Sequence, residues 1–232
     1  MKIILIVLFL VCMPSMVLSD EADLRQIIER AYPDLQIKSI KKTEFDGLYE
    51  IYIGGQIIYT DEAFKFLIVE GRLVDPKTKV DLTSQRLEEL SRVNFNALPF
   101  FDAIEDVRGN GKKKIVIFSD IDCPFCRKLE KETLMKLDDV TIYTFLYPLA
   151  IHPEAEMKSK QIWCAKDRAS AWNDYMLKGT LPNNQGKCET PIMNISRLGK
   201  ELGISSTPTI IFASGRRIEG VLSYEELIKH LD

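Results

Sequence analysis

Two cysteines separated by two residues, where a strand is expected to give way to a helix, constrain this chain more than any other feature. Residues 115–118 are apolar throughout and predict a buried strand, and Cys123-Pro124-Phe125-Cys126 follows at the start of a predicted helix. This spacing puts both sulfurs on one side of the first helical turn, where they can bond to each other. The motif therefore predicts a redox-active dithiol.

The position of each cysteine in the helix predicts different chemistry for the two thiols. Cys123 stands at the helix start, where unpaired backbone N–H groups and the positive end of the helix dipole favour the thiolate. Pro124 suits the first turn because its missing N–H is not needed there. Cys126 lies one turn further in, so we expect it to be more buried and less reactive than an accessible Cys123.

The second half of the predicted site is Thr207-Pro208, just before an apolar strand over residues 209–212. A proline at this place cannot donate a hydrogen bond to a neighbouring strand, so its backbone can lie open beside Cys123. We predict a cis peptide bond between Thr207 and Pro208, an isomer that is accessible chiefly before proline.

Two further cysteines, Cys164 and Cys188, lie 24 positions apart around a helical block predicted over residues 153–178. The favoured interpretation is a structural disulfide. The alternative is a zinc site that combines these two with Cys123 and Cys126. Zinc sites usually pair two closely spaced ligand motifs, and this chain has only one. We therefore expect no metal and no other cofactor.

The first 19 residues are typical of a secretory signal peptide. A lysine precedes an apolar run over residues 3–11, and Val17 and Ser19 suit cleavage before Asp20. An uncleaved membrane anchor is the alternative, but Pro14 interrupts the segment and a spanning helix needs about 20 apolar residues. Export implies an oxidising compartment, which suits disulfide chemistry. The formal charge of −3 argues against a general nucleic-acid binder.

The rest of the chain divides at a predicted linker helix over residues 83–98, capped by Thr83 or Ser84. Residues 20–82 combine an amphipathic helix over 20–31 with short strands over 35–40, 48–53, 56–60 and 66–69, and a last strand is possible within 73–82. So small a core often needs a partner surface, which suggests dimerisation. The alternative is that the linker helix packs wholly into one of the two cores. Residues 99–232 alternate strands and helices around the dithiol and predict an α/β catalytic domain.

Several polar residues near the motif have open roles. Asp120 and Asp122 flank the dithiol and are interpreted either as helix-capping acids or as groups that move protons. His152 precedes a proline at a strand-to-helix junction and is interpreted as a surface or capping residue rather than a base.

Three stretches of the sequence resemble the DsbC/DsbG family of bacterial periplasmic disulfide isomerases. They are FSDIDCPFC at 118–126, IWCAKD at 162–167 with the later Cys188, and GISSTPT at 203–209. The resemblance implies a thioredoxin fold with a helical insertion, and a cystatin-like N-terminal domain that forms a V-shaped homodimer. It also implies an apolar cleft for misfolded exported proteins with wrong disulfides, and a membrane reductase of the DsbD type that keeps the active cysteines reduced.

Carried over by position, Cys123 is the attacking thiol, Cys126 resolves, Thr207-Pro208 forms the cis-proline loop, and Cys164–Cys188 is a non-catalytic disulfide. The spacer Pro124-Phe125 departs from the family's DsbC branch, where Gly-Tyr is typical, toward the Pro-Tyr of DsbG. The expected function is therefore isomerisation of wrong disulfides. The alternatives are a simple dithiol oxidase or reductase, a DsbG-like reductase of oxidised cysteines, and a holdase chaperone.

Overall fold

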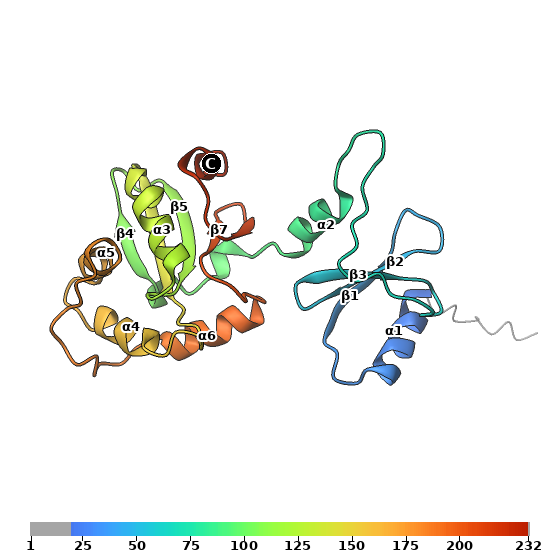
Figure 1. The fold of residues 1–232 in the computed structure, drawn as a ribbon, viewed down its shortest axis with the longest axis horizontal. Coiled ribbons are helices and arrows are strands. Elements are labelled where there is room, and N and C mark those ends of the chain that lie inside the picture. Colours follow the sequence, from blue (N-terminus) through green and yellow to red (C-terminus); the bar gives the residue numbers. More distant parts are fainter. Residues whose placement is uncertain (1–19, 232) are drawn as a thin grey trace, which may run out of the picture. The chain divides into compact units, whose positions relative to one another are not determined.

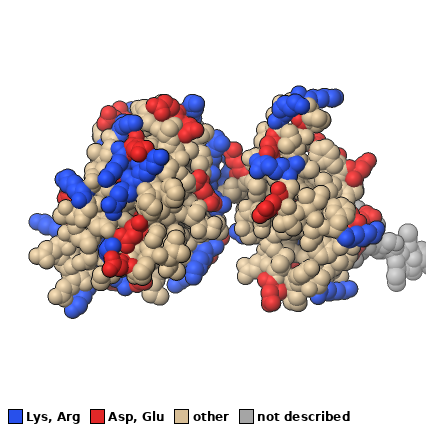
Figure 2. All heavy atoms as spheres, in the orientation of Figure 1, with Lys and Arg blue, Asp and Glu red and all other residues tan. Residues whose placement is uncertain are grey.

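The computed structural model describes residues 20–231, and the expected signal peptide over residues 1–19 lies outside them. The chain divides into two compact units, with the boundary in the sequence between Leu73 and Val74, and each is described here by itself (Figure 1). Within residues 20–231, no helix is both long and apolar enough to cross a membrane. Charged side chains of both signs cover the displayed face of each unit (Figure 2).

The first unit packs one helix, α1 (Asp20–Ala31), on a three-stranded antiparallel sheet. The strands are β1 (Ile37–Lys42), β2 (Tyr49–Ile53) and β3 (Gln56–Thr60), in that order. Leu24 and Ile28, four residues apart on α1, are fully buried against Tyr49 of the sheet. This small apolar cluster is the core of the unit, as the length of the segment predicts.

The predicted strands over residues 66–69 and 73–82 are wrong. Each segment contributes only an isolated bridge, Tyr59 with Ile68 and Val74 with Asp81. Left-handed backbone directly follows the first segment at Glu70, where φ is 58°, and interrupts the second at Lys79, where φ is 63°. An extended ladder cannot continue through such residues.

The helix that follows, α2 (Leu82–Leu90), differs from the predicted linker helix at both ends. Its N-cap is Asp81, whose side chain accepts a hydrogen bond from the Ser84 N–H at 2.8 Å, so the predicted cap at Thr83 or Ser84 is wrong. The helix also ends eight residues before position 98. Beyond it, the Val93 N–H donates to the Gly215 carbonyl at 2.9 Å.

Burial explains this early end. Val93, Phe95 and Leu98 are buried in a core cluster of the second unit with Val116 and Phe118. The free energy gained by burying these side chains outweighs the propensity of the segment after α2 to continue the helix.

The second unit is built on a five-stranded mixed sheet in the order β4-β6-β5-β7-β8. Its strands are β4 (Ile104–Val107), β5 (Lys113–Ser119), β6 (Val140–Leu146), β7 (Thr209–Phe212) and β8 (Arg217–Glu219). β5 runs parallel to β6, and the other pairs are antiparallel. The sequence analysis missed β4, because its four residues include two acids and lie at an edge of the sheet.

Both faces of the central strand are buried. Val116 and Phe118 belong to the apolar cluster on one face of the sheet, whereas Ile115 and Ile117 belong to the cluster on the other. The covering helices are α3 (Pro124–Glu132), α4 (Ala155–Trp163), α5 (Arg168–Lys178), α6 (Ile192–Glu201) and α7 (Tyr224–Ile228). The predicted continuous helical block over 153–178 is two helices, since Asp167 caps α5 by accepting from the Ser170 N–H at 2.9 Å.

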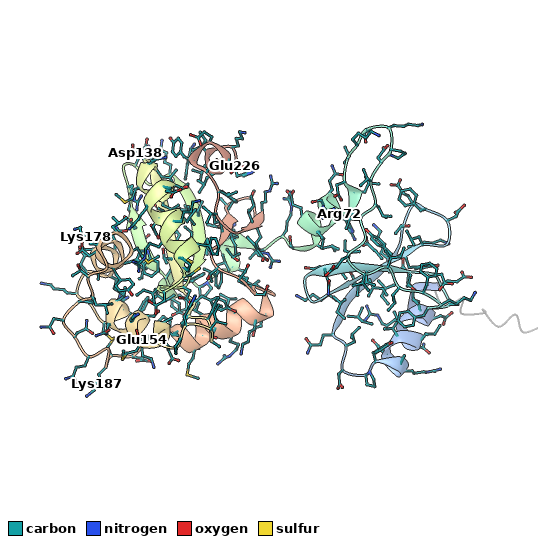
Figure 3. The ribbon with its side chains drawn as sticks, in the orientation of Figure 1. Arg72, Asp138, Glu154, Lys178, Lys187 and Glu226 are labelled. Atoms are coloured by element: carbon teal, nitrogen blue, oxygen red, sulfur yellow. A yellow bond between two sulfur atoms is a disulfide. The ribbon has the colours of Figure 1, made fainter. Side chains whose placement is uncertain are left out.

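Cys164 and Cys188 form a disulfide that joins the end of α4 to the loop before α6. Figure 3 shows the position of this loop through its labelled neighbour Lys187. The zinc alternative needs both sulfurs as free thiolates, whereas here they are bonded to each other. Among residues 20–231, no group of three or more His, Cys, Asp or Glu side chains is placed to hold a metal ion.

We expect the Cys164→Ser/Cys188→Ser variant to unfold with a free energy about 3 kcal/mol lower than the wild type, because the disulfide restricts the unfolded chain. Urea unfolding followed by tryptophan fluorescence measures the second unit, since both tryptophans of the chain lie in α4 and α5. The Cys123→Ser/Cys126→Ser variant is the matched control. Equal unfolding free energies for the wild type and the first variant would contradict the prediction.

Candidate active site

The candidate site lies where β5 ends and α3 begins. β5 ends at Ser119, and α3 begins at Pro124 with Cys123 as its N-cap residue. The Cys123 side chain makes no capping hydrogen bond, and its backbone is extended with φ −70° and ψ 122°. The first N–H groups of the helix are therefore left to interact with the sulfur. Pro124 supports this geometry because its fixed φ suits the first helical position.

The two thiols are both free in the structure and differ in ionisation. A hydrogen bond from the Cys126 thiol lowers the pKa of Cys123 to about 5, and the backbone N–H groups of Cys126 and Phe125 act in the same direction against the effect of burial. Burial raises the pKa of Cys126, and its hydrogen bond to Cys123 raises it further. At neutral pH one sulfur is therefore a thiolate and the other a thiol.

The exposed fractions of the two cysteines differ less than the sequence predicts. Cys126 is 1% exposed, but Cys123 is only 5% exposed. Both belong to an apolar cluster that includes Ile121 and Trp172. Cys123 is thus less exposed than the accessible thiol that the sequence predicts. Phe125, in contrast, is 61% exposed beside it.

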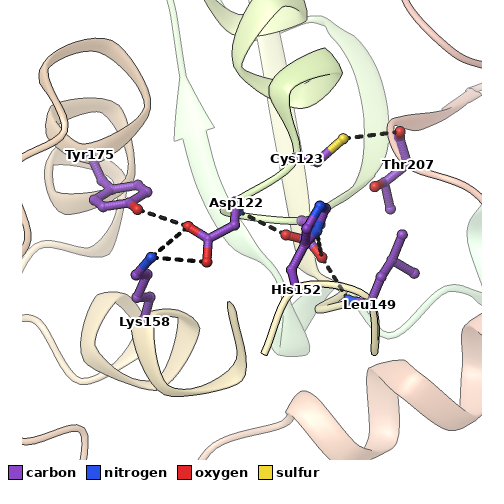
Figure 4. A network of polar contacts seen from close by, with 8 residues as sticks. Asp122, Cys123, Leu149, His152, Lys158, Tyr175 and Thr207 are labelled. Carbon is purple, nitrogen blue, oxygen red and sulfur yellow. Dashed lines mark hydrogen bonds and ion pairs between the residues drawn. The ribbon is translucent and has the colours of Figure 1, made fainter. Parts of the chain in front are cut away.

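The segment Thr207-Pro208 lies against Cys123, and its peptide bond is cis. The sulfur of Cys123 lies 3.4 Å from the Thr207 carbonyl oxygen, to which it donates when protonated (Figure 4). The Thr207 hydroxyl is buried and has no hydrogen-bond partner within the described part of the chain. It lies close enough to the sulfur to lower the pKa of Cys123. The fold thus brings together two segments 84 positions apart.

Asp120 and His152 form a contact that the sequence analysis missed. Asp120 is fully buried, and its carboxylate lies 3.0 Å from Nδ1 of His152. His152 keeps 21% of its side chain exposed, as a surface residue would, but it also pairs with this buried acid. The carboxylate of Asp120 accepts from the N–H groups of Asp122 and Leu149, neither of which belongs to α3. No local pattern could reveal this pair, because 32 positions separate the two residues.

Asp122 connects the same turn to the helical insertion. Its two carboxylate oxygens accept from Nζ of Lys158 on α4 at 2.9 and 3.0 Å, and one of them accepts from the Tyr175 hydroxyl on α5 at 2.9 Å (Figure 4). The guanidinium of Arg127, on the first turn of α3, lies 5.4 Å from the centre of the Tyr175 ring. The insertion therefore holds the turn that presents Cys123.

A second connection joins α3 to α5. Glu130 is 3% exposed, and its carboxylate accepts from the indole N–H of Trp172 at 2.8 Å. Burial raises the pKa of Glu130 to about 7, against the opposing effect of this hydrogen bond. Trp172 thus orients a buried acid on the active-site helix.

The site combines a thiolate at a helix N-terminus, a second thiol one turn inside, and a cis-proline segment against the first sulfur. Such a thiolate can attack a disulfide, and the second thiol can then release the mixed disulfide that forms. On a mixed sheet with parallel β5 and β6, this arrangement defines a thioredoxin-like thiol–disulfide oxidoreductase.

Comparisons with known proteins agree with this class. A model described as thioredoxin-like domain matches residues 100–232, and the model of the disulfide bond isomerase protein N-terminal domain matches residues 15–84. The chain is 37% identical to a probable thiol:disulfide interchange protein DsbC of Bordetella pertussis, over 84% of this chain and 68% of the relative. It is 24% identical to the thiol:disulfide interchange protein DsbC of Escherichia coli K12, over 92% and 88%.

A solved disulfide interchange protein from Neisseria gonorrhoeae has 43% identity and a TM-score of 0.54, covering 57% of this chain and 96% of that one. This chain belongs to the DsbC family and is a thiol:disulfide isomerase. The expected family, fold class and enzymatic activity are confirmed.

We expect the rate at which iodoacetamide alkylates Cys123 in the reduced protein to show a midpoint near pH 5. The thiolate is the reactive form, so the rate should fall about tenfold per pH unit below that value and level off above it. Peptide mass spectrometry separates Cys123 from Cys126, which should stay unmodified because its thiol is buried and protonated. A midpoint near 8.5, the value of an ordinary cysteine, would contradict the prediction.

Proposed function

We propose that Cys123 is the attacking thiol and Cys126 the resolving thiol in the rearrangement of wrong disulfides in exported proteins. The observation that carries this proposal is the opposite displacement of the two thiol pKa values at the start of α3. Thiolate is both the attacking form and the better leaving form, so one sulfur can begin and end an exchange while the other waits.

In the proposed cycle, the Cys123 thiolate attacks one sulfur of a client disulfide and forms a mixed disulfide, and the second client sulfur leaves as a thiolate. That thiolate attacks another disulfide of the client, and the thiolate this releases attacks the client sulfur bound to Cys123. Cys123 then departs as a thiolate, so the exchange consumes no electrons. Thr207-Pro208 is proposed to position the client beside the sulfur.

If the exchange stalls, Cys126 loses its proton and attacks the sulfur of Cys123. The client leaves with its sulfur reduced, and the enzyme keeps an internal disulfide that two electrons from a reductase must reopen. We propose a membrane reductase of the DsbD type as the source of these electrons. Residues 1–19 act in this scheme as a signal peptide that sends the protein to the periplasm.

The N-terminal domain, residues 20–82, is proposed to form a homodimer. Its small core and an exposed apolar stretch support this role. Large apolar side chains that are 40–54% exposed follow one another at Phe66, Leu67, Ile68 and Val69. Burying such a patch against a second copy removes it from water. Residues 99–232 then act as the catalytic domain, and α2 joins the two.

We expect the Cys123→Ala variant to lose reactivation of scrambled ribonuclease, because no attacking thiolate remains. The Cys126→Ala variant should keep part of the activity and accumulate mixed disulfides with the client, visible on a non-reducing gel. The Cys164→Ser/Cys188→Ser variant controls for loss of a cysteine pair as such. Full client rescue by Cys123→Ala would favour a holdase, whereas rescue of sulfenylated cysteines without ribonuclease reactivation would favour a DsbG-like reductase.

We expect light scattering to give the wild type twice the mass of one chain, and Val69→Asp to give a monomer, because a carboxylate would be desolvated at the proposed interface. The monomer should still reduce insulin but reactivate scrambled ribonuclease poorly. Val107→Asp is a matched control, since Val107 is 58% exposed on the second unit. A monomeric wild type would overturn the proposed dimer.

A further inference from the structure

The buried carboxylate of Asp120 has no part in the exchange steps described above. It is fully buried, and its oxygens accept three hydrogen bonds: from the Asp122 N–H at 2.8 Å, the Leu149 N–H at 2.6 Å and Nδ1 of His152 at 3.0 Å. A buried carboxylate is therefore placed three residues before Cys123, whose own N–H donates to the Asp120 carbonyl at 3.2 Å.

This charge opposes the chemistry of the site unless a cation offsets it, because a nearby like charge disfavours a thiolate. The ionisable groups that face this turn come from four elements: Asp120, Asp122 and Cys123 from the turn before α3, His152 from the turn before α4, Glu154 and Lys158 from the start and body of α4, and Tyr175 from α5.

The two cations of this set divide between the two acids. Lys158 lies between Asp122 and Glu154, with Nζ 2.9 Å from an oxygen of each. His152 contacts Asp120 and is 21% exposed. Within this group of described residues, His152 is thus the cation available to Asp120.

The imidazole also responds to the charge of the nearby sulfur. Nδ1 is engaged with the carboxylate of Asp120, and Figure 4 shows His152 beside the turn that carries Asp122 and Cys123. The hydrogen bond to Asp120 raises the pKa of His152 above its ordinary value, against a smaller effect of burial, and the charges of Asp120 and Cys123 raise it further. The last effect means that the imidazole is close enough to respond to the charge on the thiolate.

We propose that protonated His152 is a positioning residue of the exchange reaction: paired with Asp120, it offsets that buried charge and keeps Cys123 an effective nucleophile and leaving group. This inference rests on the proposed role of Cys123. When His152 gives its proton to solvent, Asp120 stays uncompensated beside the sulfur. Cys123 then becomes more basic and leaves a mixed disulfide more slowly, so the lifetime of that intermediate increases at alkaline pH.

A test without any change at the site follows from the reciprocity of coupled titrations. In the reduced protein Cys123 carries a charge, and in the oxidised protein it does not. We expect the pKa of His152, followed by proton NMR of its ring, to be higher by about one pH unit in the reduced form. The chain has two histidines, and the His230→Asn variant assigns their signals. Equal His152 values in the two redox forms would overturn the proposal.

A variant separates charge from structure. His152→Asn keeps a side-chain N–H near the position of Nδ1 and removes the charge, so the hydrogen bond to Asp120 can persist. We expect the alkylation midpoint of Cys123 to rise by about one pH unit, with alkylation about fivefold slower at pH 5 and about tenfold slower well below it. Asp120→Asn/His152→Asn, which removes both charges, should return toward the wild type. His230→Asn is the matched control and should not change the midpoint.

These readouts distinguish failure of the inference from failure of the proposed function. A wild-type midpoint in His152→Asn would show that His152 is only structural and would overturn the inference, whether or not ribonuclease is reactivated. A raised midpoint would support it even if Cys123 served another reductase function. If His152→Asn fails to fold, as circular dichroism would reveal, the redox dependence of the wild-type His152 titration decides alone.

Discussion

The ionised sulfur of Cys123 is the constraint on which the rest of the structure depends. A thiolate in a nearly closed apolar surrounding is unfavourable unless hydrogen bonds compensate for lost hydration. The start of α3 supplies backbone N–H groups, and Cys126 supplies a thiol donor. The Thr207 hydroxyl lies nearby and has no other partner among residues 20–231. Burial disfavours the charge on the sulfur and also shields the sulfur from solvent. The reactivity of Cys123 therefore depends on how rigidly these hydrogen-bond donors are positioned.

The helical insertion helps to hold them. α4 and α5 reach the active-site turn through Lys158 and Tyr175, which both bond to Asp122, while Trp172 bonds to Glu130 on α3. The Cys164–Cys188 disulfide closes the insertion on itself and lies apart from these contacts in the sequence. The Cys164–Cys188 disulfide thus stabilises the helical insertion, which in turn orients the Cys123–Cys126 dithiol. The turn also holds two acids close to the thiolate, and their neutralisation by Lys158 and His152 links its ionisation to tertiary contacts.

Local patterns predicted much of this arrangement. The apolar run of β5, the spacing of Cys123 and Cys126 and the punctuation by Pro124 are all features of short segments, and the structure places each where expected. Patterns failed where long-range packing competes with local preference. α2 ends at Leu90 because Val93 and Phe95 are buried in the core of the second unit. β4 forms from a short acidic segment because it pairs with β6 at the edge of the sheet.

By itself, the sequence determined the redox chemistry, since cysteine spacing and helix-start position follow from a few adjacent residues. Periodicity also predicted the central strands and most helices of the catalytic domain, whereas the thioredoxin fold was implied by the family resemblance and β4 was missed. Only the tertiary structure decided which groups share the site. The side-chain partners of Asp120, Asp122 and Glu130, and the Leu149 N–H that bonds Asp120, lie 29 to 53 positions away. A hydrogen bond requires separations near 3 Å that a one-dimensional pattern does not encode, so the surroundings that govern the reactivity of Cys123 emerge only when the sheet and its helices have packed.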